Sequence, residues 1–162
     1  MRQEIKYALL IGSLLLSLLF IILGGQIYPS LYLGVPDAGG TQDLFREDLR
    51  SQGWTLRLSI LITAIPWIMA GLFYYIINSV HFDRWWNWLI ISAISTLLSA
   101  WGAIRLLVVR MEDFQPGLSD FYAPLNEALA GWVALFSFII FTTASFGIRW
   151  WSSNCRHTPF PQ

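Results

Sequence analysis

The chain has 162 residues and a formal net charge of zero, and only 12% of its residues are charged whereas 56% are hydrophobic. Soluble domains carry about 25% charged residues, so this composition excludes an ordinary water-soluble domain. The zero net charge gives no support to a nucleic-acid-binding protein or to an acidic partner. The chain has one cysteine, Cys155, so no intrachain disulfide can form and we expect helix packing alone to hold the fold.

Four apolar segments are long enough to cross a bilayer, which takes roughly 20 apolar residues in a helix. We expect these spans at about 8–25, 58–77, 88–109 and 128–148. Each span must be helical, because lipid offers no hydrogen-bond partner to a free backbone N–H or C=O group. The sequence therefore predicts an all-α integral membrane protein, an antiparallel four-helix transmembrane bundle in which residues 1–162 form a single transmembrane domain.

The longest polar segment, residues 26–57, joins the first two spans and begins with turn-forming prolines and glycines. Thr41 then resembles a helix N-cap, and Phe45 and Leu49 follow it at helical spacing. We expect a short interfacial helix in this loop, ending near Gly53.

Basic residues divide almost evenly between the two sides of the predicted bundle, so the positive-inside rule leaves its orientation nearly tied. Acidic residues gather on the side of the 26–57 loop, whereas Arg2 and Lys6 lie just before the first span. These features favour cytoplasmic termini, and the lack of an Asn-x-Ser/Thr sequence favours a bacterial plasma (inner) membrane. The first span is long for a signal-peptide core and has no cleavage motif, so we expect it to remain as a helix.

The third span carries a stripe of small and hydroxyl-bearing side chains at helical spacing. Its members are Ser92, Ser95, Thr96, Ser99 and Gly102, and it leads toward Arg105. One interpretation is a helix–helix contact, because small residues allow membrane helices to approach closely. The other is that the stripe lines a narrow wet path, alone or repeated around an oligomer axis.

Arg105 lies about one turn from the outer end of the third span. A charge there is costly unless its side chain reaches the interface or finds a partner. Glu127, at the start of the fourth span, is the expected partner in an outer ion pair. An alternative places Arg57, Arg105 and Arg110 around a charged vestibule that attracts anions.

Two Arg-Trp-Trp triplets border the last two spans. They are Arg84-Trp85-Trp86, which enters the third span, and Arg149-Trp150-Trp151, which leaves the fourth. Arginine and tryptophan anchor at the headgroup level, so we expect both triplets at the same membrane face. An alternative is a cytoplasmic ligand face that also includes Arg156, where indoles stack on the bases of a nucleotide or oligonucleotide and arginines meet its phosphates.

No sequence pattern indicates catalysis, a metal site or a cofactor. The two histidines, His81 and His157, lie far apart, and no cluster of histidine, cysteine and carboxylate residues has metal-ligand spacing. The chain has neither a Gly-x-Ser-x-Gly sequence nor a phosphate-binding glycine loop. We therefore expect a non-enzymatic protein with no cofactor and no metal.

A single bundle of four helices encloses too little space for an aqueous channel, so function should involve assembly. The leading hypothesis is a homo-oligomeric ion channel or pore-forming membrane effector whose third spans face the axis. The alternative is a non-catalytic accessory, regulatory or immunity-type subunit that works by binding other membrane proteins. The expected partners are membrane lipids and either further copies of the chain or other membrane proteins.

Overall fold

The computed structural model describes residues 3–27, 39–77 and 84–152, and every element in this part of the chain is helical. Four of the helices are long and apolar enough to span a membrane. They are α1 (Gln3–Ile27), α3 (Trp54–Gly71) with its π-helical continuation η2 (Leu72–Ile77), α4 (Trp85–Phe114), and α6 (Ala123–Ile148) with the short 3₁₀ turn η4 (Arg149–Trp151). The prediction of four helices able to span a membrane is confirmed.

Each long helix begins or ends beyond its predicted apolar span. The 30 residues of α4 correspond to about 45 Å at a rise of 1.5 Å per residue. That length matches the roughly 40–45 Å of a bilayer including its headgroup regions, whereas hydropathy detects only the apolar middle. The polar ends of the helices are therefore long enough to reach the headgroup regions.

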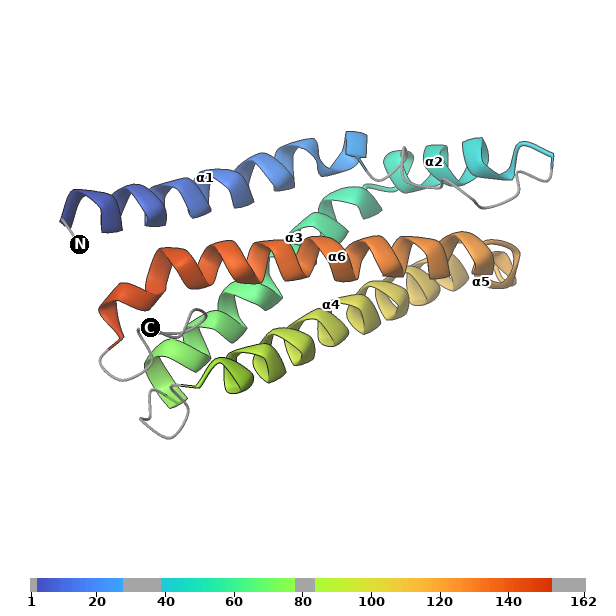
Figure 1. Ribbon diagram of the computed structural model, residues 1–162. Helices are drawn as coiled ribbons and strands as arrows, with labels where there is room; N and C mark the ends of the chain where they lie inside the picture. Colours follow the sequence, from blue (N-terminus) through green and yellow to red (C-terminus); the bar gives the residue numbers. More distant parts are fainter. Residues whose placement is uncertain (1–2, 28–38, 78–83, 153–162) are drawn as a thin grey trace.

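Consecutive long helices run in opposite directions along the chain, as Figure 1 shows. Helix α6 packs against α1, α3 and α4, and α3 also packs against α1 and α4. Helix α1 lies at the edge of the bundle and leaves most of its large apolar side chains exposed. These exposed side chains are the surface that α1 would present to lipid.

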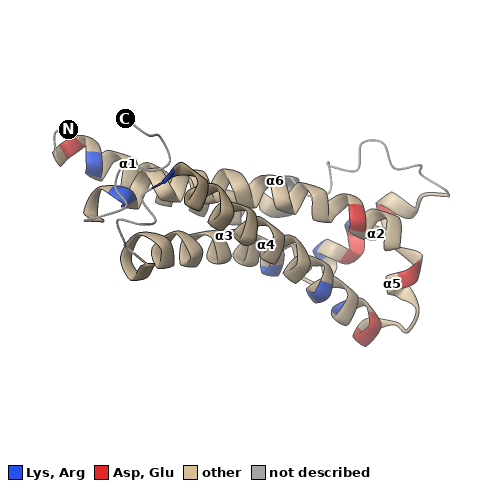
Figure 2. Cartoon of the chain, turned by 60° about the horizontal axis from the view of Figure 1, so that its bottom comes forward, with Lys and Arg blue, Asp and Glu red and all other residues tan. Residues whose placement is uncertain are grey.

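Acidic side chains gather at the end of the bundle where α2 (Thr41–Ser51) and α5 (Leu118–Phe121) lie (Figure 2). The acidic residues at this end are Asp43, Glu47, Asp48, Glu112, Asp113, Asp120 and Glu127. They outnumber the arginines near the same end, which are Arg46, Arg50, Arg57, Arg105 and Arg110. The opposite end carries Lys6, Arg84 and Arg149 with one described acid, Glu4.

A small-residue contact holds α1 to the bundle. The Trp67 indole Nε1 of α3 donates a hydrogen bond of 2.9 Å to Ser17 Oγ of α1. Gly147 of α6 lies so close to α1 that an added Cβ would sit 3.4 Å from Leu10 Cα and would also crowd Ser13. Close backbone approach through serine and glycine is the ordinary way for membrane helices to associate.

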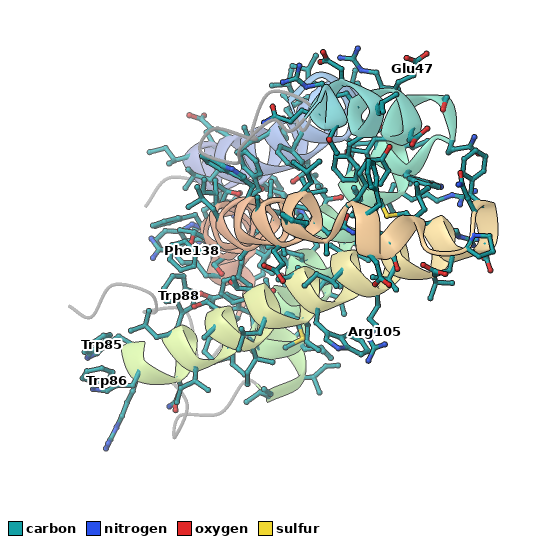
Figure 3. All side chains as sticks on the ribbon, turned by 90° about the vertical axis from the view of Figure 1, so that its right-hand side faces the viewer. Glu47, Trp85, Trp86, Trp88, Arg105 and Phe138 are labelled. Carbon is teal, nitrogen blue, oxygen red and sulfur yellow. The ribbon has the colours of Figure 1, made fainter. Side chains whose placement is uncertain are left out.

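At the end of the bundle that carries the triplets, an aromatic cluster fills the space between α3, α4 and α6. Phe73, Tyr74 and Phe141 are fully buried there, and Trp88 is almost so. The Trp88 ring lies 5.7 Å from the ring of Phe141 and 6.3 Å from that of Phe138, centroid to centroid. Figure 3 shows Trp88 and Phe138 between α4 and α6.

The predicted helix in the first loop is present as α2, but Thr41 is its first helical residue and not its N-cap. The N-cap is Gly40, whose φ of 80° is a left-handed conformation that glycine adopts without strain. At its other end, Gly53 has a φ of 65° and redirects the chain into α3. The predicted polar segment 26–57 is therefore partly helical, and its residues 28–38 lie outside the described part.

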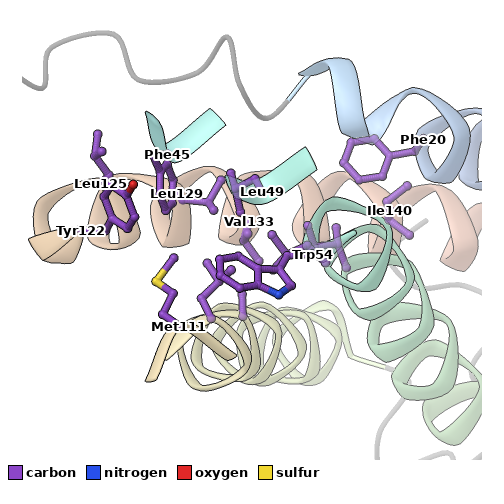
Figure 4. Close-up of a cluster of buried hydrophobic side chains, with 14 residues drawn as sticks. Phe20, Phe45, Leu49, Trp54, Met111, Tyr122, Leu125, Leu129, Val133 and Ile140 are labelled. Atoms are coloured by element: carbon purple, nitrogen blue, oxygen red, sulfur yellow. The ribbon is translucent and has the colours of Figure 1, made fainter. Parts of the chain in front are cut away.

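The apolar side of α2 is buried in the bundle. Phe45 and Leu49 have no exposed surface and pack in the main core cluster with Trp54, Met111 and Tyr122 (Figure 4). The rings of Phe45 and Tyr122 lie 4.8 Å apart, and Tyr122 Oη donates a hydrogen bond of 2.8 Å to Asp48 Oδ2. Helix α2 thus caps one end of the bundle, and its depth in a bilayer stays a prediction.

Candidate functional site

The predicted stripe on the third span lies inside the bundle. Ser92, Ser95 and Ser99 are 2%, 0% and 0% exposed, on the same side of α4 as the buried Ala103 and Leu107. Thr96 and Gly102 lie at the edges of this buried side and are partly exposed. The stripe therefore packs against neighbouring helices in the single chain.

The hydroxyls of the stripe bond mainly to their own helix. Ser99 Oγ donates to the Ser95 carbonyl at 2.9 Å, and Thr96 Oγ1 donates to the Ser92 carbonyl at 2.7 Å. Such bonds to the preceding turn satisfy a hydroxyl in an apolar interior. Ser95 Oγ itself is fully buried and makes no hydrogen bond to the described residues.

Contacts between α4 and its neighbouring helices also involve small or hydroxyl-bearing residues. Trp88 Nε1 donates a hydrogen bond of 3.1 Å to Ser145 Oγ of α6. At Gly102, an added Cβ would lie 3.3 Å from Leu61 Cδ1 of α3, so the small residue allows the two helices to meet. These contacts support the helix–helix interpretation of the stripe in the single chain.

Arg105 lies apart from the buried serines of the stripe, although Gly102 at the edge of the stripe is only three positions before it. Arg105 is six positions after Ser99, which at about 100° per residue places the two side chains about 120° apart around α4. The Arg105 guanidinium lies 5.7 Å from the ring centroid of Trp101, and both side chains are exposed on the outer face. Figure 3 shows Arg105 projecting from the side of α4 that faces away from α6.

The structure does not join Arg105 and Glu127 in an ion pair among the residues it describes. Glu127 is exposed on α6, whereas Arg105 points outward from α4, so their helix faces direct them apart. Of the three arginines in the alternative vestibule, Arg110 lies 3.7 Å from Asp113. Arg57 and Arg105 are exposed.

Both Arg-Trp-Trp triplets lie at the same end of the bundle, since α4 begins where α6 ends (Figure 1). The ring centroids of Trp85 and Trp86 lie 3.4 Å apart, with the ring planes tilted by 31° to each other. The Arg149 guanidinium lies 4.1 Å from the Trp150 ring, and the Trp151 ring lies 5.7 Å from that of Tyr7. Arg84 is the residue immediately before α4, and Arg156 lies outside the described residues. A nucleotide or oligonucleotide ligand at this face stays a prediction.

A groove that sequence reasoning missed lies at the capped end of the bundle, between α2, α5 and the adjoining ends of α4 and α6. It has a volume of about 460 Å³, and we call it the cap groove. Its lining comprises Leu44, Asp48, Phe114, Gln115, Pro116, Gly117, Leu118, Phe121 and Tyr122. Leu44, Phe114 and Phe121 are each more than half exposed at this groove. The sequence signal was the presence of apolar residues in segments otherwise rich in polar and turn-forming residues.

The turn on one side of the cap groove is braced by Glu112. Its carboxylate accepts hydrogen bonds from the backbone N–H of Gly117 at 3.1 Å and of Ser119 at 3.3 Å, and from the Ser119 hydroxyl. Gly117 has a φ of 84°, a conformation that favours glycine. These bonds give the short α5 a defined position beside α2.

Comparisons with protein-family models, with curated proteins and with solved structures found no match.

Within the described ranges 3–27, 39–77 and 84–152, no three histidine, cysteine, aspartate or glutamate residues are grouped so that they could hold a metal ion.

Tyr122 should make the docking of α2 sensitive to alkaline pH. Its burial, and secondly its hydrogen bond to Asp48 and that residue's charge, raise the pKa of Tyr122 well above its ordinary value, which is about 10. The folded state therefore favours the neutral phenol, and this stabilisation is complete below about pH 10 and declines as the pH rises further. We expect the denaturation midpoint in detergent to fall more steeply above pH 10 for the native chain than for Tyr122→Phe. Equal alkaline slopes for the two proteins would contradict this assignment.

Proposed function

We propose that this chain is a non-catalytic membrane subunit that acts by binding another membrane protein through the cap groove. The observation that carries the proposal is the exposure of Leu44, Phe114 and Phe121 around this groove. An exposed apolar patch rimmed by polar side chains is typical of an interaction site. The proposal is the accessory-subunit alternative raised from the sequence.

Charge indicates what kind of partner would fit. Asp43 and Glu47 of α2 and Asp120 of α5 lie around the groove end of the bundle, where acidic residues outnumber arginines. Glu47 projects from α2 at the edge of the molecule in Figure 3. A partner segment that combines basic and apolar side chains would match both the charge and the exposed apolar surface.

The groove also has rigid support, which reduces the entropy lost on binding. Phe45 and Leu49 anchor α2 in the core, and Glu112 braces the turn before α5. The exposed Leu44 is adjacent to the buried Phe45 on the same helix, so its backbone is held in place.

A homo-oligomeric channel has less support from the geometry. That hypothesis depended on the stripe of Ser92, Ser95, Thr96, Ser99 and Gly102. Its three serines are packed inside the single chain, and only Thr96 and Gly102 are partly exposed. The outward face of α4 carries instead large apolar side chains such as Ile94 and Leu97, which would give an oligomeric pore an apolar wall.

The experiment compares native masses of the complex extracted from membranes in mild detergent. We expect the native chain to carry a second membrane protein at fixed stoichiometry, and the double variant Leu44→Asp and Phe121→Asp to lose it while keeping its own elution volume. Trp86→Ser is the matched control, because Trp86 is an exposed aromatic residue at the opposite end and its loss should leave the complex intact.

Two outcomes would overturn the proposal. A complex that survives the cap-groove variant would show that the partner binds elsewhere. A uniform ring of this chain alone, together with ion flux in liposomes, would instead favour the channel.

A further inference from the structure

A second groove lies on the outer face of the bundle, where α3 and α4 meet. It has a volume of about 290 Å³. It is lined by Ile65, Ile68 and Met69 of α3 and by Leu98, Trp101 and Gly102 of α4. All of these residues are apolar and all lie within the spans, so we call this the lipid-side groove.

Two arginines lie at one end of the lipid-side groove. The helices run in opposite directions and meet where Leu61 faces Gly102. Arg57 comes one turn before Leu61 on the same face of α3, and Arg105 comes about one turn after Gly102 on α4. Both arginines are therefore displaced from this crossing toward the capped end of the bundle, on either side of the groove.

Neither arginine is neutralised by a residue that the structure describes. Both side chains are exposed, and neither forms an ion pair with any residue in the described part of the chain. Helical side chains tilt toward the N-terminus of their helix, and the Arg105 guanidinium accordingly lies over Trp101, one turn back along α4. Arg105 thus points along the groove toward its apolar part, where a charge without a counter-ion is costly. The same tilt on the antiparallel α3 carries Arg57 toward the capped end, so a phosphate held by both arginines would lie at the capped end of the groove.

We propose that this surface binds one anionic phospholipid of the surrounding bilayer, with its phosphate between Arg57 and Arg105 and an acyl chain in the lipid-side groove. Guanidinium groups match phosphate oxygens in charge and in geometry. In a bilayer phospholipid the phosphate lies at the membrane surface and the acyl chains extend inward from it. The two arginines and the lipid-side groove follow each other in the same order. This site lies apart from the cap groove and goes beyond the proposed function.

The surface fits a lipid better than a partner helix. Tight helix packing in membranes uses small residues at the contact. The exposed rim of this groove instead carries the large side chains of Ile68, Leu98 and Trp101, while Gly102 is occupied by its contact with Leu61. A flexible acyl chain can lie along such a rim, whereas a helix would be held away from it.

The test is a titration of the purified chain in non-ionic detergent with phosphatidylglycerol, with bound lipid counted by native mass spectrometry. We expect one tightly retained lipid, about tenfold weaker retention in Arg57→Gln and in Arg105→Gln, and no specific retention in the double variant. Ile68→Trp should weaken retention with both charges intact, because it fills the groove. Diacylglycerol, which has the acyl chains but no phosphate, should bind at least tenfold more weakly.

Arg110→Gln is the matched control, since Arg110 lies near the same end but pairs with Asp113. If Arg110→Gln weakened lipid retention as much as Arg57→Gln and Arg105→Gln do, the lipid would be held by diffuse attraction to surface charge, and the proposed site would be overturned. Diacylglycerol binding as tightly as phosphatidylglycerol would overturn the role of the phosphate. If the double variant lost a co-purifying protein and not a lipid, the two arginines would be assigned to binding a carboxylate of that partner protein.

Discussion

Replacing Ser95 and Ser99 together by leucine should destabilise the bundle. Both serines are fully buried on α4, and Ser99 Oγ bonds to the Ser95 carbonyl. Larger side chains at packed positions force shifts that cost about 1–3 kcal/mol each in soluble proteins, and here they would also push α4 away from its neighbours. We expect a lower midpoint when unfolding by dodecyl sulfate is followed by circular dichroism in micelles.

The control enlarges side chains on the opposite face of the same helix. Ile94→Phe with Leu97→Phe adds bulk where both residues are exposed, so the midpoint should stay close to that of the native chain. If Ser95→Leu with Ser99→Leu left stability unchanged but altered ion flux in liposomes, the stripe would have to face a pore and the packing assignment would be wrong.

Replacing Phe45 by alanine should release α2 from the end of the bundle. Phe45 is completely buried beside Tyr122, and removing a buried phenylalanine side chain costs about 3–5 kcal/mol. An 11-residue helix is marginal on its own in water, so α2 would unfold once its packing is lost. We expect faster amide hydrogen exchange across residues 41–51 and new tryptic cleavage after Arg46 and Arg50.

Leu44→Ala is the control for this experiment, because Leu44 is the neighbouring residue and is exposed. It should leave exchange and cleavage as in the native chain. Protection of α2 that persists in Phe45→Ala would mean that contact with the membrane surface, and not the bundle core, holds this helix in place.

The number and positions of the long helices could be predicted from composition, because an apolar run of this length can satisfy its backbone only as a helix in lipid. The spacing of Phe45 and Leu49 likewise predicted α2. That α2 docks on Tyr122 and Met111 could not be predicted, since those residues lie far along the chain and no local signal links them.

The candidate site was predicted in part. Helical spacing collected Ser92, Ser95 and Ser99 onto one side of α4, and the structure places them together. The same spacing, applied to Arg105, would have separated it from Ser99 by about a third of a turn. The ion pair between Arg105 and Glu127 was expected because both residues lie near the same membrane face. Nearness to a membrane face does not specify the direction in which a side chain points.

The contact between Gly147 and α1 limits how this protein can change over time. An added Cβ at position 147 would collide with the Ser13 hydroxyl and lie 3.3 Å from Ser13 Cβ, so Ser13 would have to rotate away from its hydrogen bond to the Leu10 carbonyl or α1 would have to move. The exposed positions Leu15 and Leu19 need only remain apolar. In descendants that keep this architecture, the outer side of the first helix can drift freely among oily residues while glycine persists at position 147.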